Sequence, residues 1–245
     1  MRALLACLLA AFAGPAFADM TAVYEGPAPN SKTMVETAAN GDFRADLWGN
    51  PGAYILSLGG KSYLIMTTSK GVVVDGAEDL GAAFAIVAER RWSADAKATI
   101  KKTAEALTSM PLSKGDDLLV RGRKGTPYYL AATRPPNIPH EFPGVPPLIV
   151  ISSDPDLAAI GKAVAREAAI SDGLIGSFAE PRAFVQVEAI LQSGAPIAFF
   201  GAELTTVSRD PISPSRFALP APPESREDII KRIDATATSG SIKAF

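Results

Sequence analysis

The sequence predicts an α+β protein with a single domain, residues 19–234, built on an antiparallel sheet. Three observations lead to this prediction. Apolar and polar residues alternate between Asp42 and Gly76, short turns separate the alternating stretches, and the apolar spacing becomes helical after Glu78. Side chains on a strand alternate between the two faces, and connections this short cannot hold crossover helices. The strands are therefore expected to form an antiparallel meander.

The segment before this meander has the features of a secretory signal peptide over residues 1–18. Arg2 supplies a positive charge, an apolar run follows it, and Ala16-Phe17-Ala18 is a small-x-small cleavage sequence. We expect cleavage after Ala18 and a periplasmic location in a diderm bacterium. The apolar run is shorter than the roughly 20 residues that a spanning helix needs, and no later segment is longer, so no integral membrane span is expected.

Cys7 is the only cysteine, and it lies inside the predicted leader. Leu4-Leu5-Ala6-Cys7 resembles the sequence at which lipoproteins are acylated, which leaves lipidation of Cys7 open as an alternative. The apolar run continues past Cys7, which favours the cleaved leader. Without Cys7 the exported chain has no disulfide, so its core alone must stabilise it.

The composition excludes some partners. Lysine and arginine total 24 against 26 aspartates and glutamates, so no basic surplus indicates binding to nucleic acid or to anionic lipid surfaces. The apolar content of 47%, with 20 glycines and 20 prolines, is typical of an ordered, loop-rich globular protein.

The first predicted elements follow each other closely. Gly26, Pro27 and Pro29 break the chain before Asp42 and leave residues 31–40 for a short helix. Predicted strands then cover residues 42–48, 53–58, 61–67 and 72–74. Gly59-Gly60 is a hairpin turn of the kind that tolerates positive φ.

Helical spacing begins at Glu78, where apolar residues recur three and four positions apart up to Arg91, and a second helix is expected over residues 95–107. Residues 116–132 read as a hairpin that turns at residues 122–125. A proline-rich connector at 134–147 then leads into a strand at 148–151.

A helix start is expected at Ser153-Asp154-Pro155. Asp154 can accept a hydrogen bond from a free backbone amide, and Pro155 occupies a position where the missing N–H costs nothing. This helix is expected to run to about Ala169 and to bury Leu157, Ile160 and Val164.

The rest of the chain alternates between short elements. Residues 184–191 form a helix or a strand, residues 193–220 supply two or three strands, and residues 224–233 form an amphipathic helix before a polar tail at 235–245. Within residues 193–220, Ile197, Phe199 and Leu204 are expected on the concave side of the sheet, and Phe217 and Leu219 complete the same wall.

The stretch DFRADLWGNPGAYILSLGGKSYLIM, Asp42 to Met66, resembles the outer-membrane lipoprotein carriers and their relatives. The resemblance covers about a quarter of the chain. It implies a strongly curved antiparallel sheet, an incomplete β-barrel, wrapped around helices on its concave side, with an apolar interior that holds acyl chains. In those carriers an arginine near the strand that matches Phe43 holds the lid helices, and Arg44 occupies the similar position. The carriers begin with a helix that packs inside the sheet, whereas here only residues 31–40 remain for a short helix.

Catalytic and metal chemistry are not indicated. His140, the only histidine, is expected to be an exposed loop residue. Helix capping accounts for Asp154 and Asp156, no G-x-S-x-G sequence marks a nucleophilic serine, and Gly59-Gly60-Lys61 opens no helix for phosphate binding. We therefore expect a non-enzyme without a metal or cofactor.

The aromatic residues are the best indication of a site. They can pack the core, or they can line an apolar cavity left between a curved sheet and its helices. The second interpretation gives a ligand-binding set, which together with the two residues of the first strand consists of Phe43, Arg44, Trp48, Tyr54, Tyr63, Phe84 and Phe199.

The predicted function is the non-catalytic binding or chaperoning of a hydrophobic small molecule or lipid, such as a lipoprotein acyl chain, in the periplasm. Two alternatives remain open at this point. One is a structural module that binds another envelope protein through the proline-rich connector or a sheet edge, and the other is a hydrolase with an unrecognised site.

Overall fold

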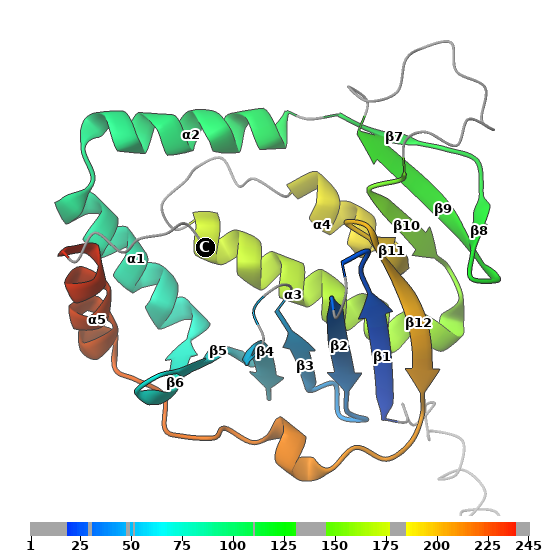
Figure 1. Cartoon of the computed structure of the whole chain (residues 1–245), viewed down its shortest axis with the longest axis horizontal. Coiled ribbons are helices and arrows are strands. Elements are labelled where there is room, and N and C mark those ends of the chain that lie inside the picture. The colour runs from blue at the N-terminus through cyan, green and yellow to red at the C-terminus, as the bar shows by residue number, and fades with distance from the viewer. Residues whose placement is uncertain are drawn as a thin grey trace, which may run out of the picture.

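The computed structural model describes residues 19–28, 31–47, 50, 52–109, 111–130, 146–176 and 185–238. In these residues the chain is an α+β protein with a large antiparallel sheet of twelve strands and five α-helices (Figure 1). The sheet is open, with strand order β6-β5-β4-β3-β2-β1-β12-β11-β10-β9-β7, and β8 pairs with β9. None of the described helices is long and apolar enough to cross a membrane.

The first six strands form a continuous meander in chain order. They are β1 (Met20–Glu25), β2 (Lys32–Thr37), β3 (Phe43–Asp46), β4 (Ala53–Leu58), β5 (Lys61–Thr68) and β6 (Gly71–Gly76). Gly59 and Gly60 have φ values of 53° and 87°, so the predicted glycine turn between β4 and β5 is confirmed.

The predicted short helix at residues 31–40 is wrong, because this segment contains β2. Thr33, Val35 and Thr37 alternate along it and are buried, and the β-branched residues favour a strand. β2 pairs along its whole length with β1, a strand that the sequence analysis did not predict.

The middle of the chain follows the predicted order, starting with two helices. These are α1 (Ala77–Arg91) and α2 (Ala94–Thr108). The strands β7 (Leu112–Lys114), β8 (Leu118–Val120), β9 (Arg123–Leu130) and β10 (Ile149–Ser152) come next. The β8–β9 hairpin turns at Arg121 and Gly122, both with positive φ, slightly earlier than expected. Most of the proline-rich connector lies outside the described residues.

The predicted helix start at Asp154 is confirmed. Its carboxylate accepts a hydrogen bond from the Asp156 amide at 2.9 Å, and Pro155 opens a 3-10 turn, η3 (Pro155–Leu157). The long helix α3 (Ala158–Gly176) follows directly, with Ile160 and Val164 buried as predicted, and ends later than expected.

The last part of the chain joins the two halves of the sheet. After α4 (Val185–Leu191), β11 (Ala195–Phe199) pairs with β10, and β12 (Ala202–Ser208) pairs with β1. Residues 193–220 thus supply two strands, and the remaining residues cross the sheet without joining it. We call residues 209–225 the strap, which contains a 3-10 turn, η4 (Pro214–Phe217), and leads into α5 (Arg226–Thr238).

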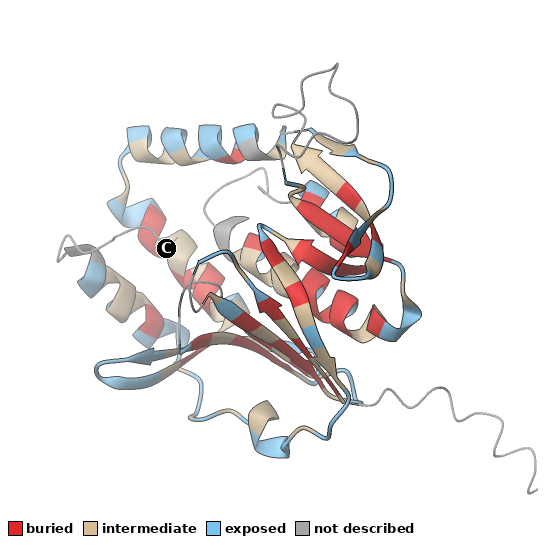
Figure 2. Cartoon of the chain, turned by 45° about the vertical axis from the view of Figure 1, so that its right-hand side comes forward, coloured by how far each residue is buried: buried red, intermediate tan, exposed pale blue. Residues whose placement is uncertain are grey.

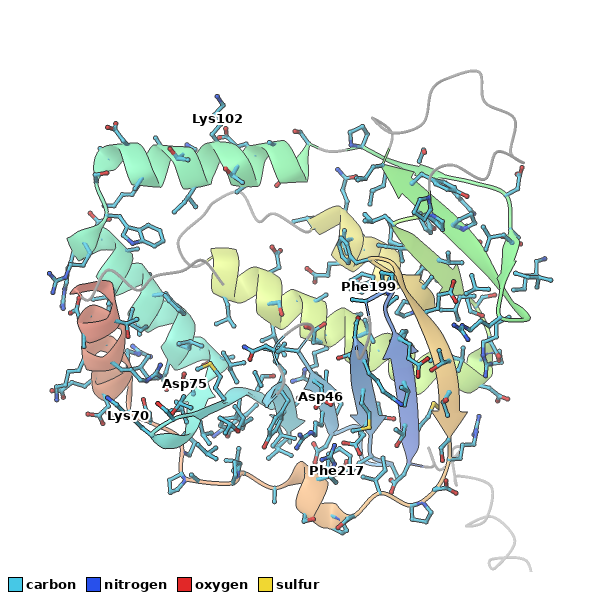
Figure 3. The ribbon with its side chains drawn as sticks, in the orientation of Figure 1. Asp46, Lys70, Asp75, Lys102, Phe199 and Phe217 are labelled. Carbon is cyan, nitrogen blue, oxygen red and sulfur yellow. The ribbon has the colours of Figure 1, made fainter. Side chains whose placement is uncertain are left out.

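The two faces of the sheet are covered differently. On the helix face, α3 packs on β1, β2, β3 and β11, and its Ile160 and Val164 join Val35, Phe43 and Ala45 in the main core (Figure 2). On the opposite face, which we call the strap face, Phe217 and Leu219 cover a cluster of buried strand residues, namely Leu56, Ile65 and Val74. The strap runs along the lower side of Figure 1, and Figure 3 labels Phe217 on it.

The expectation that Phe217 and Leu219 complete the wall of Ile197 and Leu204 is therefore wrong. Ile197 and Leu204 belong to the core on the helix face, whereas Phe217 and Leu219 pack on the strap face. The chain leaves the sheet after Ser208, because the prolines that follow in the strap cannot donate to a strand ladder.

Candidate functional site

The main candidate cleft lies where α1, α3 and the β4–β5 turn meet. It has a volume of about 930 Å³ and opens to solvent. Gly76, at the start of α1, borders it on one side, α3 borders it on another, and Gly60 and Lys61 border it at the turn. Its size is within the range of small-molecule sites.

Small residues on the two facing helices leave this space. Gly81 and Ala82 of α1 and Ala169 and Gly173 of α3 all line the cleft, and none has a side chain longer than a methyl group. A Cβ atom added at Gly173 would meet no atom within 4 Å. No side chain of the described residues therefore fills the space beside Gly173.

Larger apolar side chains supply part of the lining. Ile170 and Leu174 extend along α3, Tyr63 comes from β5, and Pro223 comes from the end of the strap. Ile170 also packs against the main core, and Leu174 packs against the cluster between α1 and α5. These contacts fix the positions of both side chains in the cleft wall. The cleft thus combines an apolar wall with small residues on both helices.

Four charged residues line the cleft. Arg166 donates through Nη2 to the carbonyl oxygen of Gly60 at 2.6 Å, which ties α3 to the β4–β5 turn. Asp79 is neutralised by Arg226 of α5, with Nη2 of Arg226 at 2.7 Å from Oδ1. Among the described residues Arg166, Lys61 and Glu78 have no ion-pair partner, so no opposite charge neutralises these three charges in the cleft lining.

A second, almost filled cavity of about 20 Å³ lies under α3, between Glu167 of the helix and the strands. The Tyr24 hydroxyl donates to the carbonyl oxygen of Pro196 at 2.8 Å, and burial raises the pKa of this tyrosine. Phe199 borders the same cavity and stacks edge-to-face on Phe200, with 4.6 Å between the ring centroids.

Glu167 is the unusual residue of this cavity. Desolvation raises the pKa of its carboxyl group to about 7, although the residue keeps some exposure, and a hydrogen bond from Ser171 at 3.2 Å opposes the shift. Leu157, Ile160 and Val164 precede it at spacings of three and four, so Glu167 continues the apolar stripe of α3. This spacing is visible in the sequence and was the signal that could have identified Glu167.

Arg44 belongs to a cluster on the strap face, away from α3. Its guanidinium lies 3.5 Å from the centroid of the Tyr54 ring and 3.4 Å from Asp46 Oδ1. Glu36, at 3.9 Å from Arg44, accepts from Arg216 of the strap at 2.6 Å. Burial raises the pKa of Asp46, and the nearby Arg44 opposes this shift. Arg44 is thus linked through Glu36 to the strap, and the described contacts give it no bond to a helix.

The predicted ligand-binding residues do not converge on one cavity. Phe43 lies in the core under α3, Arg44 and Tyr54 lie on the strap face, and Phe84 packs between α1 and α5. Of the remaining residues, Tyr63 lines the large cleft, Phe199 borders the small cavity, and Trp48 lies outside the described residues. Their role in ligand binding stays a prediction.

The other residues considered for chemistry give no further site. His140 lies outside the described residues, and the Asp154 carboxylate caps a helix. Within the described part of the chain, no group of three or more histidine, cysteine or acidic side chains lies close enough together to hold a metal ion.

Comparison of the chain with protein-family models, with curated proteins and with solved structures found no match.

Proposed function

We propose that this protein binds a hydrophobic small molecule or lipid without catalysis, in the cleft between α1, α3 and the β4–β5 turn. The cleft itself is the observation that supports the proposal. It offers about 930 Å³ of open volume, against about 20 Å³ in the cavity between α3 and the sheet. Apolar residues of α3 line the cleft, and burial of apolar surface stabilises a complex by roughly 25 cal/mol per Å².

The place of the ligand in this proposal differs from the one that the resemblance to lipoprotein carriers implies. In that resemblance the sheet is an incomplete barrel that wraps around helices, and acyl chains lie inside it. Here Ile160 and Val164 of α3 fill the corresponding space against Phe43 and Ala45. A ligand between α3 and the sheet would have to displace these buried side chains, whereas a ligand in the cleft would enter a space that is open to solvent.

The proposal keeps the expectation of an exported protein. With a leader at residues 1–18 that is cleaved after Ala18, the binding step would take place in the periplasm, where a carrier of a hydrophobic molecule would shield it from water during transfer. The absence of covalent chemistry is part of the proposal, since a carrier must release its ligand unchanged.

A titration with a fluorescent fatty acid tests the site. Gly173→Trp puts an indole ring into the cleft from a position where an added Cβ meets nothing within 4 Å. Gly173→Ala is the matched control, because it adds only a methyl group at the same place. We expect the wild type and Gly173→Ala to bind and Gly173→Trp to lose at least tenfold in affinity. No saturable binding by the wild type, or equal affinity in all three proteins, would contradict the proposal.

A further inference from the structure

We infer that the cleft prefers amphipathic molecules that carry one anionic group, a carboxylate or phosphate, over neutral molecules with the same chain. The inference rests on the proposed function and adds the charge of the ligand. It follows from the charges that line the cleft, which among the described residues are two cations without ion-pair partners, one neutralised carboxylate and one carboxylate without an ion-pair partner.

Arg166 is the residue best placed to hold the anionic group. Its bond to the Gly60 carbonyl oxygen fixes the guanidinium at the mouth of the cleft, at 2.6 Å. A guanidinium has five N–H donors, so most of them remain available to a carboxylate or phosphate. Because one hydrogen bond already orders the side chain, less rotamer freedom is lost when a ligand binds.

Lys61 adds a second positive charge beside Arg166. It follows Gly60 directly, lines the same cleft, and has no ion-pair partner among the described residues. An ammonium group on a flexible side chain can adjust to an anion that the guanidinium holds. Lys61 and the Gly60 carbonyl that Arg166 contacts are adjacent in the sequence, so both cations border the end of the cleft formed by the β4–β5 turn.

The two acidic residues that line the cleft, Asp79 and Glu78, repel a bound anion to different extents. The contact with Arg226 neutralises Asp79, which leaves Glu78 as the opposing charge. Glu78 is exposed and lies on the α1 side of the cleft. Removing its charge should therefore strengthen the binding of an anion, while removing the charge of Arg166 or Lys61 should weaken it.

Binding of a fluorescent fatty acid and of its methyl ester tests the inference, because the two share one chain and differ in charge. We expect the wild type to bind the acid about fivefold more tightly than the ester. Arg166→Gln and Lys61→Gln should each reduce this preference, and Glu78→Gln should increase it. Lys61→Gln keeps the bond between Arg166 and Gly60, so it tests the charge without disturbing the turn.

Lys70→Gln is the control for net charge. Lys70 is exposed in the β5–β6 turn, outside the cleft lining (Figure 3), and its replacement should leave the preference unchanged. Equal binding of acid and ester by the wild type would overturn the inference and leave the proposed function standing. Binding of neither would overturn the proposed function itself. Displacement of the acid by millimolar inorganic phosphate alone would indicate a site for small anions and would also overturn the inference.

Discussion

Arg232 of α5 donates through Nη2 to both carboxylate oxygens of Asp75, at 2.6 and 2.7 Å, and the Asp75 side chain is fully buried at the end of β6. The Nε atom of Arg232 donates to Glu224 at 3.0 Å, and the Glu224 amide donates to the Val74 carbonyl oxygen. This contact therefore fixes the end of the strap and the start of α5 to the edge of the sheet (Figure 3).

Arg232→Gln should destabilise the protein by about 3–5 kcal/mol, because it leaves Asp75 buried without its cation. Arg226→Gln is the matched control on the same helix. It breaks an ion pair whose side chains are 54% and 43% exposed, and such pairs contribute about 1 kcal/mol or less. Urea denaturation of both variants gives the two free energies of unfolding. Similar losses in the two variants would contradict the assigned role of Asp75.

The free energy of unfolding should fall as the pH rises through the range in which the Glu167 carboxyl group loses its proton. Burial raises the pKa of this carboxyl group to about 7 in the folded protein, above its ordinary value in an unfolded chain. The folded state thus binds more protons between these two values, so the stabilisation is present at low pH and is lost as the pH rises toward 7 and above.

Glu167→Gln should remove this dependence and make the protein more stable than the wild type at pH 8, by on the order of 2 kcal/mol. Glu105→Gln, on the exposed side of α2, should leave the pH profile unchanged. Thermal unfolding between pH 5 and 8 measures the effect. A Glu167→Gln profile parallel to that of the wild type would show that the carboxyl group is ionised in the folded protein.

Two glycines of α3 should respond in opposite ways to alanine. At Gly161 an added Cβ would lie 2.9 Å from the backbone carbonyl of Gly194, so Gly161→Ala should destabilise the protein by about 1–3 kcal/mol. At Gly173 the space is open, so Gly173→Ala should stabilise it by about 0.5–1 kcal/mol through helix propensity. Denaturation midpoints of the two variants check these predictions. A more stable Gly161→Ala variant would contradict the close contact between α3 and the Gly194 backbone.

The strap should loosen when its contact with Glu36 is removed. Arg216→Gln leaves the Glu36 side chain, only 8% exposed, without its closest cation, and we expect faster hydrogen exchange at the strap amides and a loss of about 1–3 kcal/mol. Arg209→Gln, also in the strap, serves as the control, because it removes an exposed ion pair between Arg209 and Asp156. Unchanged exchange in Arg216→Gln would contradict the assigned role of the Glu36 contact in holding the strap.

The elements predicted correctly are those with strong local signals. The alternation and short turns of β3 to β6, the glycine pair at residues 59 and 60, and the cap at Asp154 all act within a few residues. The prediction for Lys32–Thr37 was wrong because the glycine and prolines before this segment suggested a break followed by a short helix. The segment forms a strand because it pairs with β1.

The arrangement of the site depended on contacts between distant residues, which local patterns do not specify. The pairing of β12 with β1 and the passage of the strap over Leu56 and Ile65 bring together residues more than a hundred positions apart. The cleft likewise brings distant residues together, since Arg166 bonds to Gly60, 106 positions away in the sequence. Aromatic residues indicated burial, whereas seven of the sixteen residues that line the cleft are glycine or alanine and only Tyr63 is aromatic.

Native mass spectrometry of the protein purified from the organism that makes it tests the central proposal most directly. The account predicts that the wild type and Gly173→Ala carry a bound molecule that organic solvent extracts, and that Gly173→Trp, with the cleft filled, does not. A wild-type protein without any bound molecule, or a Gly173→Trp variant that carries the same molecule at the same occupancy, would contradict the proposal that the cleft is the binding site.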